Sequence, residues 1–133
     1  MADADKGRQQ GKPGGGKRRA KKPSQAQRRR VEEGRRRANL IWAIAHRLRR
    51  EILRAIADSD KACSPTWLAD ALDLPLSTAA YHVTILRRFE AVELADEQMA
   101  RGAVEHFYVS TIKNDPPIEA LLAETREADE DGA

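Results

Sequence analysis

Residues 64–91 read SPTWLADALDLPLSTAAYHVTILRRFEA, and this stretch decides the fold. We predict two short helices joined by a tight turn. Ser64 is a suitable N-cap for a first helix over residues 65–72, which opens on a proline where no N–H donor is missed. The tripeptide at 73–75 then ends that helix, because the residue before a proline is disfavoured in the α conformation. A second helix is predicted over residues 76–89.

Each predicted helix has one apolar face and one polar face. The predicted core faces, from apolar residues at helical spacing, are Leu68, Ala71 and Leu72 in the first helix and Ala79, Val83 and Leu86 in the second. The outer side of the second helix carries Ser77, Thr78, Ala80, Tyr81, Thr84, Arg87 and Arg88. Its hydroxyl, phenol and guanidinium groups are those that a helix in a DNA groove needs. The alternative is an ordinary amphipathic helix with a solvated polar face.

A second structural signal follows directly after these helices. Residues 92–95 and 106–110 predict two short strands, and the polar residues 96–102 between them predict a loop. A helix-turn-helix followed by a hairpin predicts a winged helix-turn-helix domain over residues 46–112, so the fold class is mainly α with a small β-hairpin wing. Arg101, near the tip of the wing, either contacts the minor groove or a phosphate, or is a solvated loop arginine.

The N-terminal part of the chain is strongly basic. Residues 1–38 hold 14 Lys and Arg against 4 Asp and Glu, although the whole chain has a net charge of only +3. Residues 1–23 are rich in Gly, Lys, Arg and Gln, and we expect them to be a disordered arm. The cations proposed to attract nucleic acid without sequence preference are Lys17, Arg18, Arg19, Lys21 and Lys22. The alternatives are a solubilising tail, an RNA-binding arm or a contact with an acidic protein.

Helical segments flank the predicted winged domain. Residues 24–45 predict an arginine-rich helix that leads into the core, followed by a helix over residues 47–57 that could also be continuous with it. Trp42 is expected in core or dimer packing. Residues 113–133 predict a short helix, capped by Asp115, that packs on the first helix within a protomer or across a dimer, and then a frayed acidic tail.

Several segments share a pattern with one protein family. Residues 45–53 read AHRLRREIL, residues 68–74 read LADALDL, residues 76–86 read LSTAAYHVTIL, and Phe107-Tyr108 lies in the second strand. These resemble the AH-x-LRxxIL, LAxxLGL, LSxSTVSxHLxxL and GRxxxY motifs of the ArsR-like (arsenic-repressor type) winged helix-turn-helix transcriptional regulators. The resemblance covers about half of the chain, roughly residues 46–110.

The resemblance implies a dimer that binds duplex DNA in a sequence-specific way. By motif position, the residues that meet base edges are Ser77, Thr78, Ala80 and Tyr81. Ser77, Thr78 and His82 lie where the family contacts backbone phosphates, and Arg101 lies in the wing.

Some positions depart from the family pattern. Ser64 and Thr66 occupy the positions of the usual metal-binding cysteines and Cys63 is displaced, so we expect neither a metal site nor a cofactor. Pro75 replaces the usual N-cap serine of the recognition helix, whose cap must then come from elsewhere. Thr84 replaces a common basic residue, which weakens the phosphate-binding face.

Composition narrows the function further. A single cysteine, no apolar run of about 20 residues and no apolar signal region predict a cytoplasmic, nucleoid-associated protein without a membrane span. A P-loop, a nucleophile elbow and a histidine cluster at metal spacing are missing from the sequence, so we do not expect an enzyme. We predict a homodimeric, DNA-binding transcriptional regulator whose effector, if any, the sequence does not specify. The alternatives are a winged-helix protein-interaction module that the basic arm tethers to DNA or RNA, and RNA binding through the arginine-rich segment alone.

Overall fold

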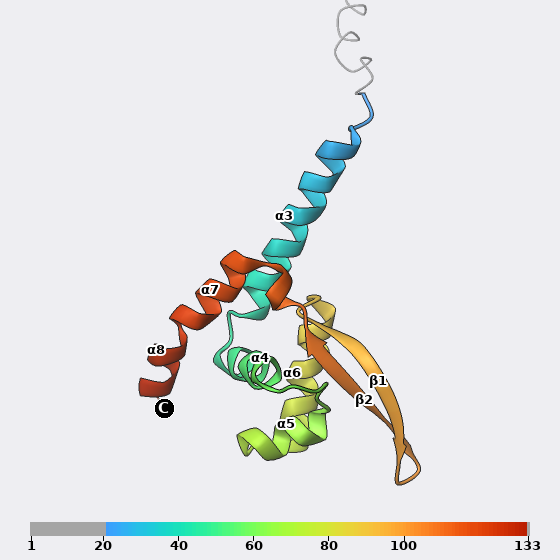
Figure 1. Cartoon of the computed structure of the whole chain (residues 1–133), viewed down its shortest axis with the longest axis vertical. Helices are drawn as coiled ribbons and strands as arrows, with labels where there is room; N and C mark the ends of the chain where they lie inside the picture. The colour runs from blue at the N-terminus through green and yellow to red at the C-terminus, as the bar shows by residue number, and fades with distance from the viewer. Residues whose placement is uncertain (1–20, 133) are drawn as a thin grey trace, which may run out of the picture. The chain divides into compact units, whose positions relative to one another are not determined.

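The structure, a computed structural model, describes residues 21–132. Of these, residues 21–31 and residues 32–132 belong to two different compact units. The elements, in chain order, are α3 (Gln25–Ala43), α4 (Arg47–Asp58), α5 (Pro65–Leu72), α6 (Leu76–Arg88), β1 (Val92–Ala100), β2 (Ala103–Ser110), η1 (Ile112–Asn114), α7 (Pro116–Glu124) and α8 (Arg126–Asp131) (Figure 1). The predicted class, mainly α with a two-stranded hairpin, is confirmed. Lys17, Arg18 and Arg19 of the predicted arm lie outside the described residues, whereas Lys21 and Lys22 are exposed and belong to no helix or strand.

Helices α3 and α4 are separate. His46 has extended backbone and caps α4, because its Nδ1 accepts a hydrogen bond at 3.0 Å from the N–H two residues further on. At the end of α3, the carbonyl of Ala43 accepts a hydrogen bond at 2.8 Å from Arg49 Nε of α4. A break between two helices leaves N–H groups and carbonyls without partners inside a helix. Here the side chains of His46 and Arg49 supply partners for two such groups. The single continuous helix that the sequence allowed is wrong.

The core of the unit from residue 32 onward is formed by apolar residues of the helices and of the base of the hairpin. Its largest fully buried side chains are Leu40, Ile52, Leu53, Leu68, Val83 and Leu86. The predicted inner stripe of α6 is confirmed, since Ala79, Val83 and Leu86 are all at most 1% exposed. In α5, the prediction for Ala71 is wrong: Ala71 is exposed and Ala69 is buried in its place.

The turn between α5 and α6 has the geometry of a tight helix-turn-helix. Asp73 follows α5 in the left-handed conformation (φ 54°), and the N–H of Leu74 donates to the carbonyl of Ala69 at 2.9 Å. A left-handed residue at this place is a common way to stop a helix. At the other end of α5, Ser64 Oγ accepts a hydrogen bond from the N–H of Trp67 at 3.1 Å. The predicted bounds of α5 are confirmed.

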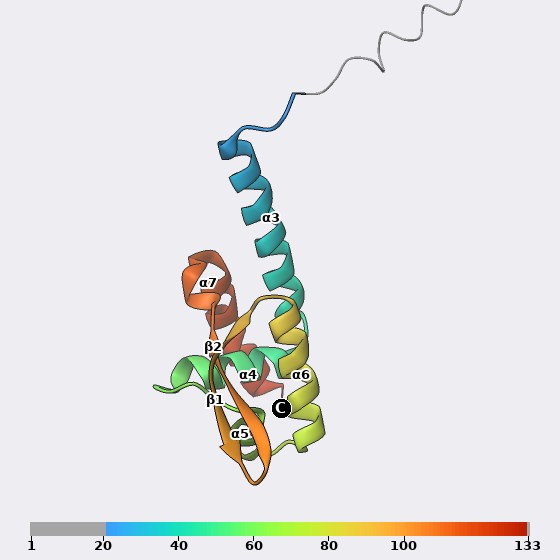
Figure 2. The same ribbon diagram turned by 90° about the vertical axis from the view of Figure 1, so that its right-hand side faces the viewer.

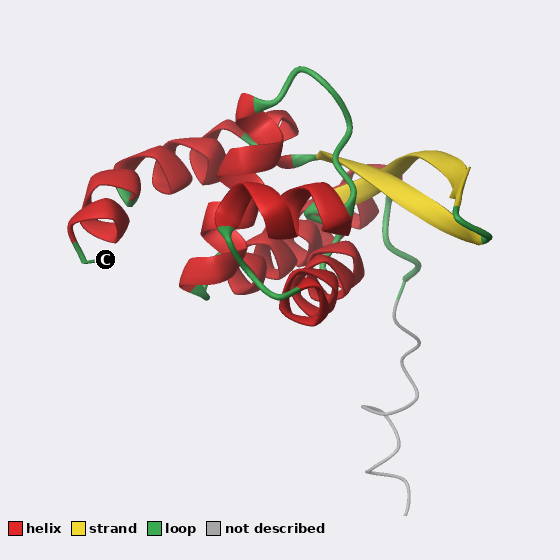
Figure 3. Ribbon diagram, turned by 90° about the horizontal axis from the view of Figure 1, so that it is seen from below, coloured by secondary structure: helices red, strands yellow, loops and turns green. Residues whose placement is uncertain are grey.

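The hairpin is longer than predicted. β1 and β2 pair antiparallel with one bulge, between Leu94 and Asp96, and the residues predicted as a loop continue the ladder. Only Arg101 and Gly102 form the turn, with φ angles of 54° and 81°. Positive φ at both turn residues matches the twist of the two strands, so the strands reach the tip. Figure 3 shows the hairpin projecting from the helices.

The base of the hairpin is tied to the helices by backbone hydrogen bonds. Cys63, just before α5, exchanges two backbone bonds of 2.9 Å with Tyr108 of β2. Thr111, just after β2, donates from its hydroxyl to the carbonyl of Glu90, which follows α6. The hairpin is therefore held at both the start of α5 and the end of α6, and Figure 2 shows α6 beside it.

Helix α7 begins as predicted. Asp115 caps it, and the carboxylate of Asp115 also accepts a hydrogen bond at 3.0 Å from Arg37 Nε of α3. Ile118 and Leu122 of α7 are 3% and 6% exposed and belong to the same core as Leu40. The predicted packing of this helix against the first helix is confirmed within one chain.

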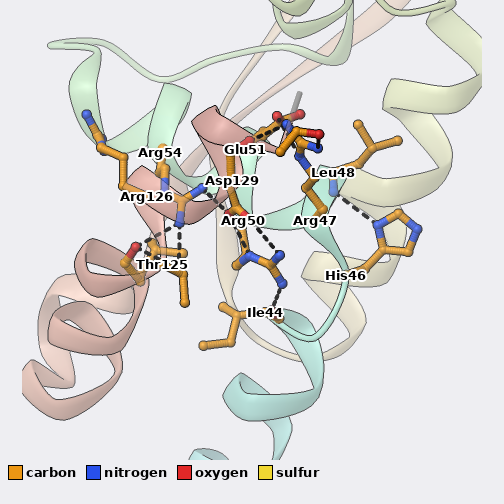
Figure 4. A network of polar contacts seen from close by, with 12 residues as sticks. Ile44, His46, Arg47, Leu48, Arg50, Glu51, Arg54, Thr125, Arg126 and Asp129 are labelled. Carbon is orange, nitrogen blue, oxygen red and sulfur yellow. Dashed lines mark hydrogen bonds and ion pairs between the residues drawn. The ribbon is translucent and has the colours of Figure 1, made fainter.

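The acidic C-terminal segment is ordered, which corrects the expectation of a frayed tail. Asp129 of α8 is 8% exposed and accepts hydrogen bonds from two arginines of α4, at 2.7 and 2.8 Å from Arg50 and at 2.6 Å from Arg54 (Figure 4). Arg54 also donates to the carbonyl of Leu122 and to the hydroxyl of Thr125. The hydrogen bonds from Arg50 and then Arg54 hold the pKa of Asp129 well below its usual range. Asp129, a residue of the tail that was expected to fray, thus joins α8 to α4.

We expect Asp129→Ala to lower Tm by at least about 5 °C, because it leaves the buried Arg54 without its carboxylate partner. Circular dichroism melts measure this, and Asp131→Ala, at an exposed position of the same helix, is the matched control. Since the folded-state pKa is lowered, the stabilisation by Asp129 is present above about pH 4 and is lost as the pH falls further. Equal Tm values for the two variants would contradict this role.

Ser64→Ala is expected to lower the free energy of unfolding by about 1 kcal/mol, since it removes the side-chain cap of α5. Thr66→Ala, at an exposed position in the first turn of the same helix, should change it by less than about 0.5 kcal/mol. Urea denaturation measures both variants. The same loss in both would mean that the cap bond does not stabilise the domain.

Candidate nucleic-acid interface

The outer face of α6 is free to meet a ligand because its inner face is fixed in the core. Ser77, Thr84, Arg87 and Arg88 are exposed, and Tyr81 is 61% exposed. Thr78 and Ala80 are half-buried at the edge of this face. Among the sequence-predicted residues, the structure therefore groups the hydroxyl, phenol and guanidinium groups of α6 on one accessible side. The hydroxyl of Thr84 donates to the carbonyl of Ala80 at 2.9 Å and keeps its acceptor sites.

The N-terminus of α6 is open. Pro75 is its N-cap, and within residues 21–132 no side chain bonds the first N–H groups of this helix. The expectation that another side chain supplies the cap is thus not met. Unpaired N–H groups and the helix dipole make a helix N-terminus favourable for an anion such as a phosphate. In α5, by contrast, Ser64 supplies a side-chain acceptor.

The C-terminal end of α6 carries cations next to the wing. The guanidinium of Arg87 lies 5.8 Å from the centroid of the Tyr108 ring of β2, within the range of a cation–π contact. Arg88 is exposed in the same last turn of the helix. These two residues are positive charges at the place where helix and hairpin meet.

The wing itself is mostly acidic. Arg101 is exposed at its tip, as predicted, whereas the exposed carboxylates of β1 are Glu93, Asp96 and Glu97. Next to the tip, Met99 and Val104 face each other across the strands and are 71% and 49% exposed. The charge of the hairpin therefore favours contact with DNA at its tip rather than along its length.

His82 differs from the other predicted DNA-contacting residues. It is 6% exposed, and its ring lies against the ring of His46 at a centroid distance of 4.7 Å. This burial counts against the phosphate contact expected from its motif position, because a phosphate cannot reach a ring closed off by the helix packing. Its sequence position, directly before Val83 of the inner stripe, is the signal that its side chain turns toward the core.

Two exposed apolar residues of the helix-turn-helix were not identified from sequence. Leu76, at the first position of α6, is 53% exposed, and Trp67 of α5 is 45% exposed. Leu76 continues the inner stripe at helical spacing, so periodicity alone places it in the core. Only the packing shows that the core reaches Ala79 but not Leu76.

The surroundings of Cys63 disfavour a metal site. Cys63 is 2% exposed and its Sγ lies 3.4 Å from the carbonyl of Lys61. Burial raises the pKa of this thiol, which disfavours the thiolate that binds metals. Residues 21–132 contain no cluster of three His, Cys, Asp or Glu side chains that could hold a metal ion. In the same range, none of the helices combines the length and apolar character of a membrane span.

Part of the chain matches a known protein family. Residues 44–95 match the model of a family described as a helix-turn-helix domain. Comparison with curated proteins gave no match.

Solved structures show the same fold. HlyU from Vibrio cholerae is 26% identical over 67% of this chain and 90% of its own, with a TM-score of 0.51. NolR from Sinorhizobium fredii is 20% identical over 80% of this chain and 97% of its own, also with a TM-score of 0.51.

A third similar structure is the homodimeric winged helix-turn-helix DNA-binding domain (fragment 1–100) of Mb0332 from Mycobacterium bovis, described as a possible ArsR-family transcriptional regulator. It is 18% identical over 85% of this chain and 93% of its own, with a TM-score of 0.53. The residues that match the family model, 44–95, include α4, α5, α6 and the start of β1. They therefore include the exposed outer face of α6. Residues 44–95 therefore form a helix-turn-helix domain, and together with the hairpin they give the chain a winged helix-turn-helix fold.

Proposed function

We propose that this protein regulates transcription by binding duplex DNA, with α6 in the major groove and the tip of the wing in the adjacent minor groove. The observation that carries the proposal is the face of α6 opposite its buried stripe. That face exposes Ser77, Tyr81, Arg87 and Arg88 on a helix whose position the core fixes. A helix so held can present side chains to base edges with little loss of entropy on binding.

The two ends of α6 have different proposed roles. At the N-terminal end, Ser77, Thr78 and Tyr81 contact base edges, and the open N–H groups bond a phosphate. At the C-terminal end, Arg87 and Arg88 neutralise phosphates and set the register of the helix along the groove. Arg101 at the tip of the wing enters the minor groove, while the carboxylates of β1 keep the sides of the wing away from the backbone.

The basic arm supplies a second, less specific contribution. Lys17, Arg18, Arg19, Lys21 and Lys22 attract phosphates through counterion release, which depends strongly on salt and little on sequence. This contribution offsets a winged domain that is itself slightly acidic, since residues 46–112 hold 8 Lys and Arg against 10 Asp and Glu. A regulator of this kind acts on the nucleoid, in the cytoplasm.

We further propose that the protein acts as a homodimer. Ile41 and Trp42 near the end of α3 are 49% and 64% exposed, and Leu121 of α7 is 40% exposed. Trp42 was expected to pack in the core or in a dimer. Its exposure contradicts core packing and supports dimer packing. Mb0332, which has a similar fold, is homodimeric. A symmetric dimer would place two α6 helices in successive major grooves.

Fluorescence anisotropy with a duplex enriched by selection tests the role of α6. Tyr81→Ala and Arg88→Ala are each expected to weaken binding about 5- to 150-fold, because each removes a contact worth about 1–3 kcal/mol. Lys113→Ala, at an exposed position outside the proposed interface, is the matched control. If both α6 variants bind like the full wild-type chain, the domain is a protein-interaction module and the regulator mechanism fails.

Deletion of residues 1–23 separates the arm from the domain. The deletion is expected to lower affinity for random and selected duplex alike and to flatten the dependence of log K on log salt. It should leave the preference for the selected duplex at about 10³-fold or more. If it abolishes all binding, and the full chain treats duplex DNA and single-stranded RNA alike, the nucleic-acid affinity belongs to the arm alone.

Trp42→Arg is expected to convert the dimer to a monomer, since it puts a charge on the apolar surface that the partner would cover. Sedimentation velocity over a range of protein concentrations measures this, with Arg36→Ala, at an exposed position of the same helix, as control. A wild-type chain that sediments as a monomer at all concentrations would refute the dimer.

A further inference from the structure

Two histidine rings join the recognition helix to the preceding helices. His46 lies between α3 and α4, and His82 lies in the middle of α6. Their ring centroids are 4.7 Å apart, with the rings tilted by 47°. This contact joins the α3–α4 junction directly to the helix that we propose to enter the major groove.

The hydrogen bond of His46 requires an uncharged ring. Its Nδ1 accepts the N–H of Leu48 at 3.0 Å and thereby caps α4 (Figure 4). A protonated imidazole has N–H groups at both nitrogens and accepts no hydrogen bond. Protonation of His46 at this nitrogen would therefore remove the cap of α4.

The environment of His82 also favours an uncharged ring. His82 is 94% buried, and its Nδ1 has no hydrogen-bond partner among residues 21–132. Burial, then the neighbouring His46 and then Arg49 lower the pKa of His82 below its ordinary value. Among residues 21–132, this ring forms no hydrogen bond and no ion pair with a carboxylate. The edge of the Tyr81 ring, 5.2 Å away, completes its surroundings.

We propose that His46 and His82 are a positioning pair that holds α6 in place for DNA while both rings are uncharged, and that acidification releases α6 and weakens DNA binding. When the pH falls, a proton on the buried His82 meets the ring of His46 and the positive charge of Arg49. A proton on His46 Nδ1 removes the acceptor that caps α4. The packing of α6 against the α3–α4 junction then opens. The effect on DNA rests on the proposed function, whereas the contact itself can be tested without DNA.

The direction of the pH effect on stability follows from the lowered pKa of His82. A histidine in the unfolded chain titrates near pH 6.5, whereas the buried His82 takes up its proton only at lower pH. Between these two values the unfolded state binds more protons, so stability is highest above about pH 6.5 and falls as the solution becomes more acidic. A histidine that simply contacted phosphates would act in the opposite direction, because its positive charge would strengthen DNA binding at low pH.

The test compares the full wild-type chain with His46→Asn at constant ionic strength, from pH 7.5 to pH 5.5. Asparagine is also a good N-cap, so this variant keeps an acceptor for α4 and removes the imidazole that faces His82. The matched control is His106→Asn, which removes the half-exposed histidine of the wing near Glu97. Thermal melts at pH 7.5 check that all three chains fold.

For the wild type and the His106→Asn control, we expect the affinity for the selected duplex to fall at least about threefold between pH 7.5 and pH 5.5. For His46→Asn the fall should be smaller than in the wild type, because the variant removes the ring that faces His82 while the burial of His82 is unchanged. Equal falls in wild type and His46→Asn, or an affinity that rises with acidity in the wild type, would overturn the proposal.

A second measurement does not involve DNA. The chain has three histidines, so the Hε1 resonances in proton NMR can be assigned from the two variants. The resonance of His82 should titrate below the normal histidine range, and its midpoint should move in His46→Asn but not in His106→Asn. A normal midpoint for His82 would refute the pair. If the pair titrates as expected but no duplex is bound at any pH, the proposed function fails instead.

Discussion

The arrangement of this domain depends on the burial of one face of α6. Val83 and Leu86 are essentially inaccessible and share a core with Leu53 of α4 and Leu68 of α5. Full burial of such a side chain stabilises the fold by about 1.5–3 kcal/mol, so a few of them are enough to fix a helix of this length. Once that face is fixed, the helical period turns Ser77, Tyr81 and Arg88 toward solvent. The core therefore decides which side chains could reach DNA in the proposed complex.

Two groups of arginines in the domain have different surroundings. Those of α4 serve the fold: Arg49 bonds the end of α3, and Arg50 and Arg54 hold Asp129 of α8. Arg87 and Arg88, with fewer partners, face solvent at the end of α6. A count of basic residues would assign both groups to DNA, but guanidinium groups that already bond carbonyls and a carboxylate have few donors left for phosphates.

The α3–α4 junction links an exposed apolar surface of α3 to α6. The exposed Ile41 and Trp42 lie just before it, and His46 within it contacts His82 of α6. In the proposed dimer, a partner subunit packed on α3 would thus lie next to the residues that contact α6. The junction is short, and both helix ends have hydrogen-bond partners across it.

The sequence by itself determined the local elements: α5 from Ser64 and its following proline, the inner stripe of α6 from its period, and the start of α7 from Asp115. These depend on neighbours along the chain, which a pattern reports directly. The tertiary structure alone decided three other features: the order of the acidic tail, the burial of His82 and the exposure of Leu76. Each depends on a partner far away in sequence or on where the core ends. Asp129 meets arginines 75 and 79 residues earlier, and no local period encodes such a contact.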